Sequence, residues 1–277
     1  MKKLMIAASA ALCATASLLA VESANIVGYM TSGSPYSGTF SRGGMFIGVN
    51  SDYCDIQSII PQFPADATDA PLDGAYVIQE LDDYGTFVQD YYWLLAGSPS
   101  ATNGEAGWYT LGASGYTKAT RTFERGEGFI FAAPYYEDTD GNELPVDYQI
   151  AGEVKTEAKA VPYEYSGTWS RANYRPIEMS IQKIVPVFPK DATDAPLDGA
   201  FVLQELDDYG TFVQDYYWLL EGSPSATNGE AGWYTLGSSG YTKADRVFAA
   251  GEGFILAAPY YEDADGNELG SSLQFME

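Results

Sequence analysis

The sequence predicts an all-β protein with two tandem homologous domains, each a β-sandwich or jelly-roll-like unit. The first observation is an internal repeat, in which residues 64–144 recur as residues 189–269 with 11 of 81 positions changed. The second is a series of short runs rich in Tyr, Phe, Val and Ile, separated by clusters of Gly, Pro, Asn and Asp. The third is the lack of long segments with an apolar period of about 3.6 residues. Together these features favour a sandwich or jelly roll over a closed barrel.

The repeat divides the chain into three expected segments. Residues 1–24 form a signal peptide, residues 25–149 a first β-domain and residues 150–277 a second β-domain. The boundary between the domains depends on an alignment of Ile26–Gly28 with Ile150–Gly152. Each unit then has the size of one ordinary domain.

The first segment has the order of a secretory signal peptide. Met1 and two lysines precede an apolar, Ala-rich stretch that extends to about Ala14, and small residues follow. Cleavage after Ala16 fits, and so does cleavage near Ser23 or Ala24. We therefore expect a secreted, periplasmic or cell-surface protein. No other run approaches about 18 consecutive apolar residues, so we expect no transmembrane segment.

Within the first unit, the pattern predicts a β-hairpin. Residues Ala75–Leu81 and Thr86–Leu95 are rich in aromatic and β-branched residues, and Asp82–Gly85 between them has the composition of a turn. Alternation along the second strand predicts that both of its faces are mostly covered. One face carries Phe87, Gln89, Tyr91 and Trp93, and the other carries Val88, Asp90, Tyr92 and Leu94.

A short helical turn is expected at Ile56–Ile60, capped by Asp55 and ended by Pro61. Further strands are expected at Ile26–Met30, Met45–Val49, Gly107–Leu111, Gly128–Ala132 and Val146–Ile150.

The positions that differ between the two copies predict which side chains are buried. Volume-conserving apolar exchanges are typical of packed positions, and they occur at Tyr76/Phe201, Ile78/Leu203 and Phe131/Leu256. Changes of polarity or charge are typical of the surface, and they occur at Ala96/Glu221, Thr120/Asp245, Glu124/Ala249 and Arg125/Ala250. We expect the first set to point inward and the second to face solvent.

The composition is strongly acidic and contains no histidine. The chain has 14 Lys and Arg against 38 Asp and Glu, which gives a formal net charge of −24. This charge repels phosphate backbones and suits cation binding or a basic partner, so nucleic acid is not an expected partner. The absence of histidine excludes Ser-His-Asp and Cys-His catalysis. We expect no enzyme and no cofactor, with calcium as a candidate ion because it prefers oxygen ligands.

Two acidic segments, at residues 137–143 and 262–268, are the candidate calcium sites. An EF-hand does not fit, because with Gly141 at its sixth position the first position would be Tyr136. A polar hairpin turn built on Asp-Gly is the alternative reading of the same residues. The candidate ligands are Asp138, Asp140, Asn142, Glu143, Asp263, Asp265, Asn267 and Glu268.

Repeated aromatic residues form a second candidate site. Ring faces can stack on the C–H surfaces of sugars, whereas core packing is the alternative for large aromatics. The candidate platform consists of Tyr92, Trp108, Tyr109, Tyr217, Trp233 and Tyr234. A group of carboxylates around the hairpin turn, including Glu80 and Asp90, is interpreted as a solvated edge instead of the carboxylate pair of a glycosidase.

Three short motifs carry a resemblance to other proteins. The run Ser23–Tyr29, the mid-chain run Ile150–Glu153 and the two Gly-Glu-Gly-Phe motifs resemble exported bacterial proteins with two related β-rich halves, for which no activity is established. The resemblance covers nearly the whole mature chain. It implies export and duplication, and it supplies no catalytic residue.

These observations indicate a non-enzymatic surface or extracellular protein, structural or adhesive, with two equivalent domains. The expected partners are other copies of the chain, an envelope component or a glycan. The alternative is a carbohydrate-binding module stabilised by calcium.

Overall fold

The fold is a set of antiparallel β-sheets, as expected for an all-β protein. The computed structural model describes residues 27–34, 38–43, 46–47, 53–82, 86–154, 160–162, 166–175, 177–207 and 211–276. The expected signal peptide at residues 1–24 lies outside them. The helices in the described part are short 3₁₀ turns at Ile56–Ser58, Thr102–Gly104, Ile181–Lys183 and Thr227–Gly229.

Strands of the first half form one large sheet and two small ones. The six-stranded sheet has the order β2 (Gly38–Gly43), β11 (Gly128–Ala133), β6 (Val77–Leu81), β7 (Phe87–Leu94), β8 (Gly107–Gly112) and β9 (Gly115–Lys118). A second sheet joins β12 (Val146–Val154) to β1 (Val27–Ser34), β3 (Phe46–Ile47) and β5 (Ile59–Gln62). The third pairs β4 (Tyr53–Asp55) with β10 (Thr122–Glu124).

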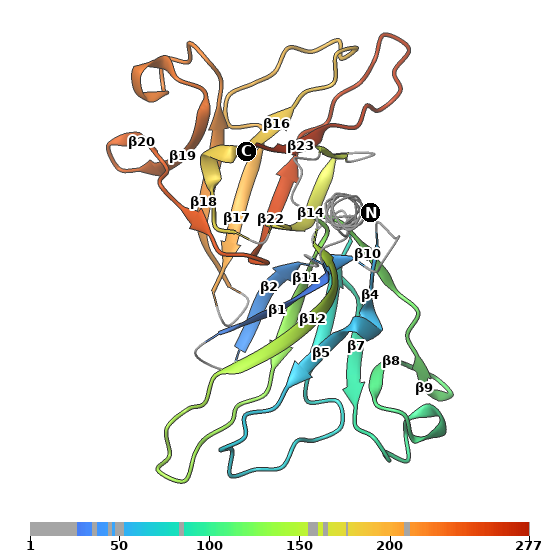
Figure 1. Ribbon diagram of the computed structural model, residues 1–277. Coiled ribbons are helices and arrows are strands. Elements are labelled where there is room, and N and C mark those ends of the chain that lie inside the picture. Colours follow the sequence, from blue (N-terminus) through green and yellow to red (C-terminus); the bar gives the residue numbers. More distant parts are fainter. Residues whose placement is uncertain are drawn as a thin grey trace, which may run out of the picture.

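Strands of the second half repeat this arrangement, and Figure 1 shows the two sets at opposite ends of the molecule. The six-stranded sheet has the order β14 (Gly167–Ala172), β22 (Gly253–Ala258), β17 (Val202–Leu206), β18 (Phe212–Leu219), β19 (Gly232–Gly237) and β20 (Gly240–Lys243). The smaller sheets contain β13 (Ala160–Pro162), β23 (Ser272–Phe275) and β16 (Ile184–Val187), and β15 (Met179–Ser180) with β21 (Val247–Phe248).

The predicted hairpin is present as β6 and β7. The two strands pair antiparallel, with Ile78 opposite Tyr91. Asp82 closes the turn, since its Oδ1 accepts a hydrogen bond from the backbone N–H of Thr86 at 2.8 Å. Residues 83–85 of the expected turn lie outside the described part of the chain.

The expected helical turn is shorter than predicted. Asp55 caps it as expected, because its Oδ1 accepts a hydrogen bond from the N–H of Gln57 at 2.8 Å. The turn ends at Ser58, however, and Pro61 lies inside β5, opposite Tyr148 of β12. The β-branched pair that precedes Pro61 favours an extended backbone, so the strand begins two residues before the proline.

The pairing of the strands disagrees with the alignment of Ile26–Gly28 with Ile150–Gly152, on which the expected domain boundary at residue 150 depended. Ile150 lies inside β12 and pairs with Ile59, whereas Phe275 of β23 pairs with Ile184. Because Ile59 and Ile184 are equivalent in the repeat, Ile150 corresponds to Phe275 and not to Ile26. The strand β12 continues to Val154 while paired with β1 and β3 of the first half.

A core of aromatic residues lies between the large sheet and the β5–β12 sheet of the first half. The ring of Tyr148 lies 5.9 Å from that of Phe129 and 5.1 Å from that of Phe131. The indole Nε1 of Trp108 donates a hydrogen bond to the carbonyl of Ile59 at 2.6 Å. A second cluster of the same kind fills the second half, where Trp233 donates to Ile184.

A glutamine side chain ties the 3₁₀ turn to the large sheet in each half. The Nε2 of Gln57 donates hydrogen bonds to the carbonyls of Trp108 and Ala119, each at 2.9 Å. Its Oε1 accepts from the N–H of Trp108 at 3.0 Å. A Cβ at Gly107 would lie 2.5 Å from this oxygen, so glycine leaves room for the amide. Gln182 makes the equivalent three bonds in the second half.

The differences between the copies predicted burial correctly at most positions. All six residues expected to point inward are buried. Of the residues expected outside, Ala96, Glu124 and their counterparts are exposed, as are Thr120 and Asp245. The prediction for Arg125 is wrong, because its side chain is buried. The corresponding Ala250 packs against the core of the first half.

Arg125 is buried because the two halves contact each other there. Its guanidinium carbon lies 5.6 Å from the ring centroid of Tyr174 in the second half. The N–H of Ala172 donates to the carbonyl of Gly126 at 3.1 Å. At Gly128 a Cβ would lie 2.8 Å from backbone atoms of Arg171, so a larger residue would separate the halves.

The contact between the halves is reciprocal. Strand β11 contacts β14, and their equivalents β22 and β2 also contact each other. Ile130 and Ile255 are buried although they point away from the aromatic cores of their own halves. We attribute their burial to the opposite half, in the self-complementary manner of a two-fold interface.

Removing the glutamine amide should destabilise the fold. Gln57→Ala leaves two carbonyls and one N–H without their side-chain partner, so the free energy of unfolding should fall by about 2–3 kcal/mol. Urea denaturation followed by tryptophan fluorescence measures this change. Gln62→Ala is the control, because within the described part of the chain its side chain bonds the nearby carbonyl of Ile60, and it should change stability by less than about 0.5 kcal/mol.

The exchange of Tyr76 for Phe201 should make the first core more stable than the second. The Tyr76 hydroxyl donates to the carbonyl of Gln62 at 3.0 Å and also bonds Tyr136. In the second half, the buried hydroxyl of Tyr261 has no hydrogen-bond partner among the described residues. Phe201→Tyr should therefore raise the free energy of unfolding by about 1 kcal/mol, and Tyr76→Phe should lower it by a similar amount. Denaturation curves with shifts in the opposite directions would contradict this explanation.

Candidate functional site

The outer face of each six-stranded sheet is the surface that the core leaves free. Along β18, Tyr216 and Trp218 point into the core, whereas Asp215 and Tyr217 point to the opposite face. That face is covered at one end, where Leu219 packs with Tyr234. The other end of the strand is open. There Phe212 is 54% exposed and Val213 is 58% exposed.

A hollow of about 310 Å³ occupies the open part of this face in the second half. Its lining combines apolar, aromatic, amide and carboxylate groups from three neighbouring strands. The main lining residues are Gln204 of β17, Phe212, Val213, Asp215 and Tyr217 of β18, and Leu236 of β19. We call this hollow the sheet groove.

Hydrogen bonds hold the polar residues of the sheet groove in place. Gln204 Nε2 donates to Asp215 Oδ1 at 2.9 Å, and the Tyr217 hydroxyl donates to Asp215 Oδ2 at 3.3 Å. Gln214 Nε2 donates to the carbonyl of Asp215 at 2.7 Å. Burial and the nearby Asp215 carboxylate raise the pKa of Tyr217, so its hydroxyl stays protonated at neutral pH.

The first half contains the same polar network. Gln79 Nε2 donates to Asp90 Oδ1 at 3.0 Å, and the Tyr92 hydroxyl donates to Asp90 Oδ2 at 3.3 Å. Gln89 Nε2 donates to the carbonyl of Asp90 at 2.7 Å. Val88 and Leu111, which correspond to Val213 and Leu236, are also exposed. Each half therefore presents the same chemistry on its outer face.

Most of the predicted aromatic platform belongs to the core. Trp108, Tyr109, Trp233 and Tyr234 are fully buried, so these four residues cannot present a ring face to a ligand. Their polar atoms bond the protein backbone; the hydroxyl of Tyr109, for example, donates to the carbonyl of Glu105 at 2.9 Å. Tyr92 and Tyr217 are half-buried on the outer face, and Tyr217 lines the sheet groove.

The predicted calcium segments are hydrogen-bonded turns. Oδ1 of Asp138 accepts hydrogen bonds from the N–H groups of Asp140 and Asn142, each at 2.9 Å, and its Oδ2 accepts from Asn142 Nδ2 at 2.9 Å. Asp263 has the same contacts in the second copy. Glu268 is engaged elsewhere, since its Oε1 accepts from the N–H of Ser166 at 2.6 Å. Within the described ranges, no three acidic or cysteine side chains are grouped to hold a metal ion.

Glu80 does not lie on a solvated edge, as its place near the hairpin turn suggested. Its carboxylate forms an ion pair with Arg121 and accepts a hydrogen bond from the Tyr91 hydroxyl at 2.5 Å. Arg121 also pairs with Glu127, and its guanidinium carbon lies 4.7 Å from the ring centroid of Phe123. Glu127, the glutamate of the first Gly-Glu-Gly-Phe motif, therefore has a structural role in this network. Arg246 is the centre of the same network in the second half.

Comparisons with known proteins add no relative. No family model matches the chain, and neither the curated proteins nor the solved structures contain a match. Among the described residues, no helix is long and apolar enough to span a membrane.

The acidic turn should respond to pH through Asp138. Hydrogen bonds from the side chain and backbone of Asn142 lower the pKa of this carboxyl below its ordinary value. The stabilisation of the turn by the ionised Asp138 carboxylate should be complete above about pH 4, the pKa range of an unfolded Asp. It should be lost as the pH falls through the lowered pKa of this carboxyl in the folded state. The protection factor of the Asn142 amide, which is its exchange rate by NMR corrected for the intrinsic pH dependence of exchange, should fall over that acidic range. This assignment would be wrong if the Asn142 amide exchanged at the same rate in Asp138→Ala as in the wild type.

Proposed function

We propose that the chain is an exported, non-enzymatic binding protein, made of two tandem β-sandwich or jelly-roll-like domains that present equivalent faces for adhesion or assembly. The observation that carries this proposal is the repeated chemistry of the outer sheet faces. Each face combines a tyrosine, two glutamines and one aspartate with exposed apolar side chains.

The two-domain organisation is supported by the duplicated sheets and cores. Each half has a six-stranded sheet of the same order and an aromatic cluster of its own. Because β12 pairs with β1, we place the boundary after Val154 and before Ala160, and not at residue 150.

A binding role fits the groups that the groove brings together. Asp215 accepts hydrogen bonds from Gln204 and Tyr217, so its carboxylate is fixed in position. Each carboxylate oxygen can accept a further hydrogen bond from a ligand. Phe212 and Val213 supply apolar area beside these polar groups. Such a mixture can orient a ligand without forming or breaking a bond.

A glycan is the second candidate, because the groove offers both an aromatic ring for the C–H groups of a sugar and polar groups for its hydroxyls. The aromatic ring of Tyr217 can pack on sugar C–H groups, and Gln204 and Asp215 can bond sugar hydroxyls. The hollow of about 310 Å³ lies within the size range of small-molecule sites. This candidate uses the half-buried tyrosines in place of the buried tryptophans of the predicted platform.

The proposal predicts that both faces contribute to binding. Purified protein should bind isolated cell envelopes or a subset of a glycan array, and Gln79→Ala with Gln204→Ala should weaken binding about tenfold or more. Each single variant should have a smaller effect, because two linked sites bind with avidity. Surface plasmon resonance on the immobilised envelope fraction or glycan measures these differences.

The control for this experiment is Val247→Ala, an exposed position outside the groove, which should bind as the wild type does. Urea midpoints establish that all variants are folded. Protein that leaves both envelopes and glycans unbound would contradict the proposal, as would wild-type binding by the double glutamine variant.

A further inference from the structure

A second hollow lies at the tip of the second half, away from the sheet groove. In the second half, the loop after β16 and the segment after β22 are joined where the N–H of Thr193 donates to the carbonyl of Glu262 at 2.9 Å. Between them is a hollow of about 340 Å³. Its lining includes Asp194, Leu197, Pro259, Tyr260 and Tyr261.

The hollow combines uncovered apolar surface with negative charge. Leu197 is 69% exposed and Tyr260 is 55% exposed, although side chains of this size normally lose such area to packing. The Tyr260 hydroxyl donates to Glu262 Oε2 at 3.1 Å, which fixes the position of the ring. Asp194 supplies a carboxylate beside the apolar residues.

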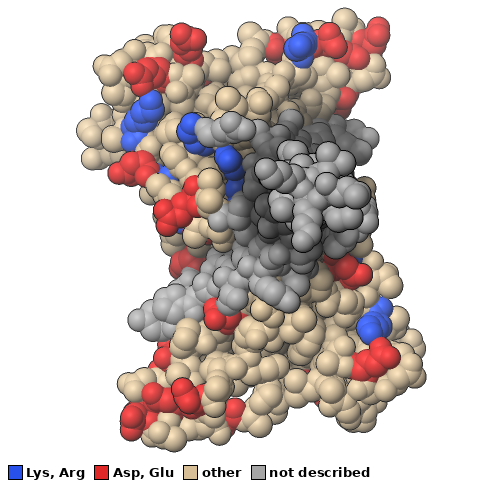
Figure 2. Space-filling model, viewed as in Figure 1, with Lys and Arg blue, Asp and Glu red and all other residues tan. Residues whose placement is uncertain are grey.

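This chemistry matches the side chain of a lysine or an arginine. Its methylene stem can cover Leu197 and Pro259, while its charged head reaches Asp194 and the face of the Tyr260 ring. Acidic side chains also gather at both ends of the molecule in Figure 2. With a formal net charge of −24, the chain attracts basic polypeptides and repels acidic ones.

The first half has an identical set of residues at its own tip. Asp69, Leu72, Pro134 and Tyr135 correspond to the lining residues above. Leu72 and Tyr135 are exposed to the same extent as their counterparts, 69% and 55%. The loops are joined in the same way, since the N–H of Thr68 donates to the carbonyl of Glu137.

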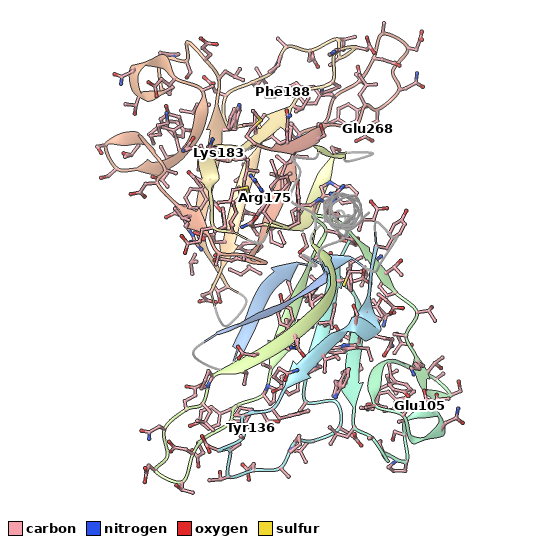
Figure 3. The ribbon with its side chains drawn as sticks, viewed as in Figure 1. Glu105, Tyr136, Arg175, Lys183, Phe188 and Glu268 are labelled. Atoms are coloured by element: carbon pink, nitrogen blue, oxygen red, sulfur yellow. The ribbon has the colours of Figure 1, made fainter. Side chains whose placement is uncertain are left out.

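The two tips lie at opposite ends of the molecule. Figure 1 shows the loops projecting away from each other, and in Figure 3 the labelled Tyr136 and Phe188 lie near the bases of the lower and upper loops. One ligand side chain cannot reach both tips, so two occupied tips would join two separate segments.

We propose that each tip hollow takes a Lys or Arg side chain from a basic polypeptide segment, so that one chain bridges two such segments. This site is separate from the sheet groove. The tip hollow recognises a cation on an apolar stem of its partner, whereas the sheet groove is suited to a neutral hydrogen-bonding ligand.

A labelled peptide tests this assignment. Fluorescein-labelled octalysine should bind at two equivalent sites per chain in about 150 mM salt, where charges more than about 8 Å apart are screened. The double variant Tyr135→Ala with Tyr260→Ala keeps the net charge and should weaken binding about fivefold. Tyr135→Phe with Tyr260→Phe keeps both rings and should bind more tightly than the double Tyr→Ala variant. Fluorescence anisotropy titrations give affinity and stoichiometry.

Two matched charge variants separate the hollow from general attraction to an acidic protein. Asp69→Asn with Asp194→Asn should weaken binding more than Asp140→Asn with Asp265→Asn, which removes equal charge from the neighbouring turns. Equal effects of these two pairs would overturn the proposal, and so would unchanged binding by the double Tyr→Ala variant or no binding of the wild type. Urea midpoints of each variant exclude unfolding as the cause. The glutamine variants of the sheet groove should bind octalysine normally.

Discussion

The amide of Gln57, with its counterpart Gln182, is the interaction on which the arrangement of each half depends. One side chain satisfies two carbonyls and one N–H of the strands around Trp108. Those backbone groups lie where the start of β8 meets the 3₁₀ turn, and without the amide the Trp108 N–H and the Ala119 carbonyl would lose this partner, whereas the Trp108 carbonyl would keep its bond from the N–H of Ala119. The same clamp positions the Trp108 indole, which bonds the carbonyl of Ile59 across the core. The Gln57 amide and the Trp108 indole therefore hold the 3₁₀ turn, the small sheet and the large sheet together at one point.

The packing of each half determines which surfaces remain for recognition. The inner face of the large sheet is occupied by the largest aromatic residues, including Trp108 and Phe131. Part of the outer face, around Ile130, is covered by the other half. The open ends of β7 and β18 and the distal loops are left uncovered. The sheet groove and the tip hollow both lie in these uncovered regions of the second half, and the residues equivalent to their linings recur in the first half because the fold is repeated.

The sequence predicted local structure well and long-range contacts poorly. The hairpin and the inward positions such as Tyr76 follow from alternation and from volume-conserving exchanges, which are local properties. Burial of Arg125 follows from a contact with Tyr174 of the other half, which no local pattern reveals. Trp108 was predicted as a platform residue because alternation along a strand does not show which of its two faces is covered by the rest of the protein. Of the groove residues, Tyr217 was predicted as part of a site, whereas Gln204 and Asp215 were missed because they lie on different strands and become neighbours only through register.

Hydrogen–deuterium exchange of Gln57→Ala tests the central claim most directly, because it reports on each clamp separately. The N–H of Trp108 bonds Gln57, and the N–H of Trp233 bonds Gln182. If each half is held by its own clamp, protection should be lost at Trp108 and its neighbours on β8 while Trp233 keeps its wild-type protection. Unchanged protection at Trp108, or equal loss at both tryptophans, would contradict the account.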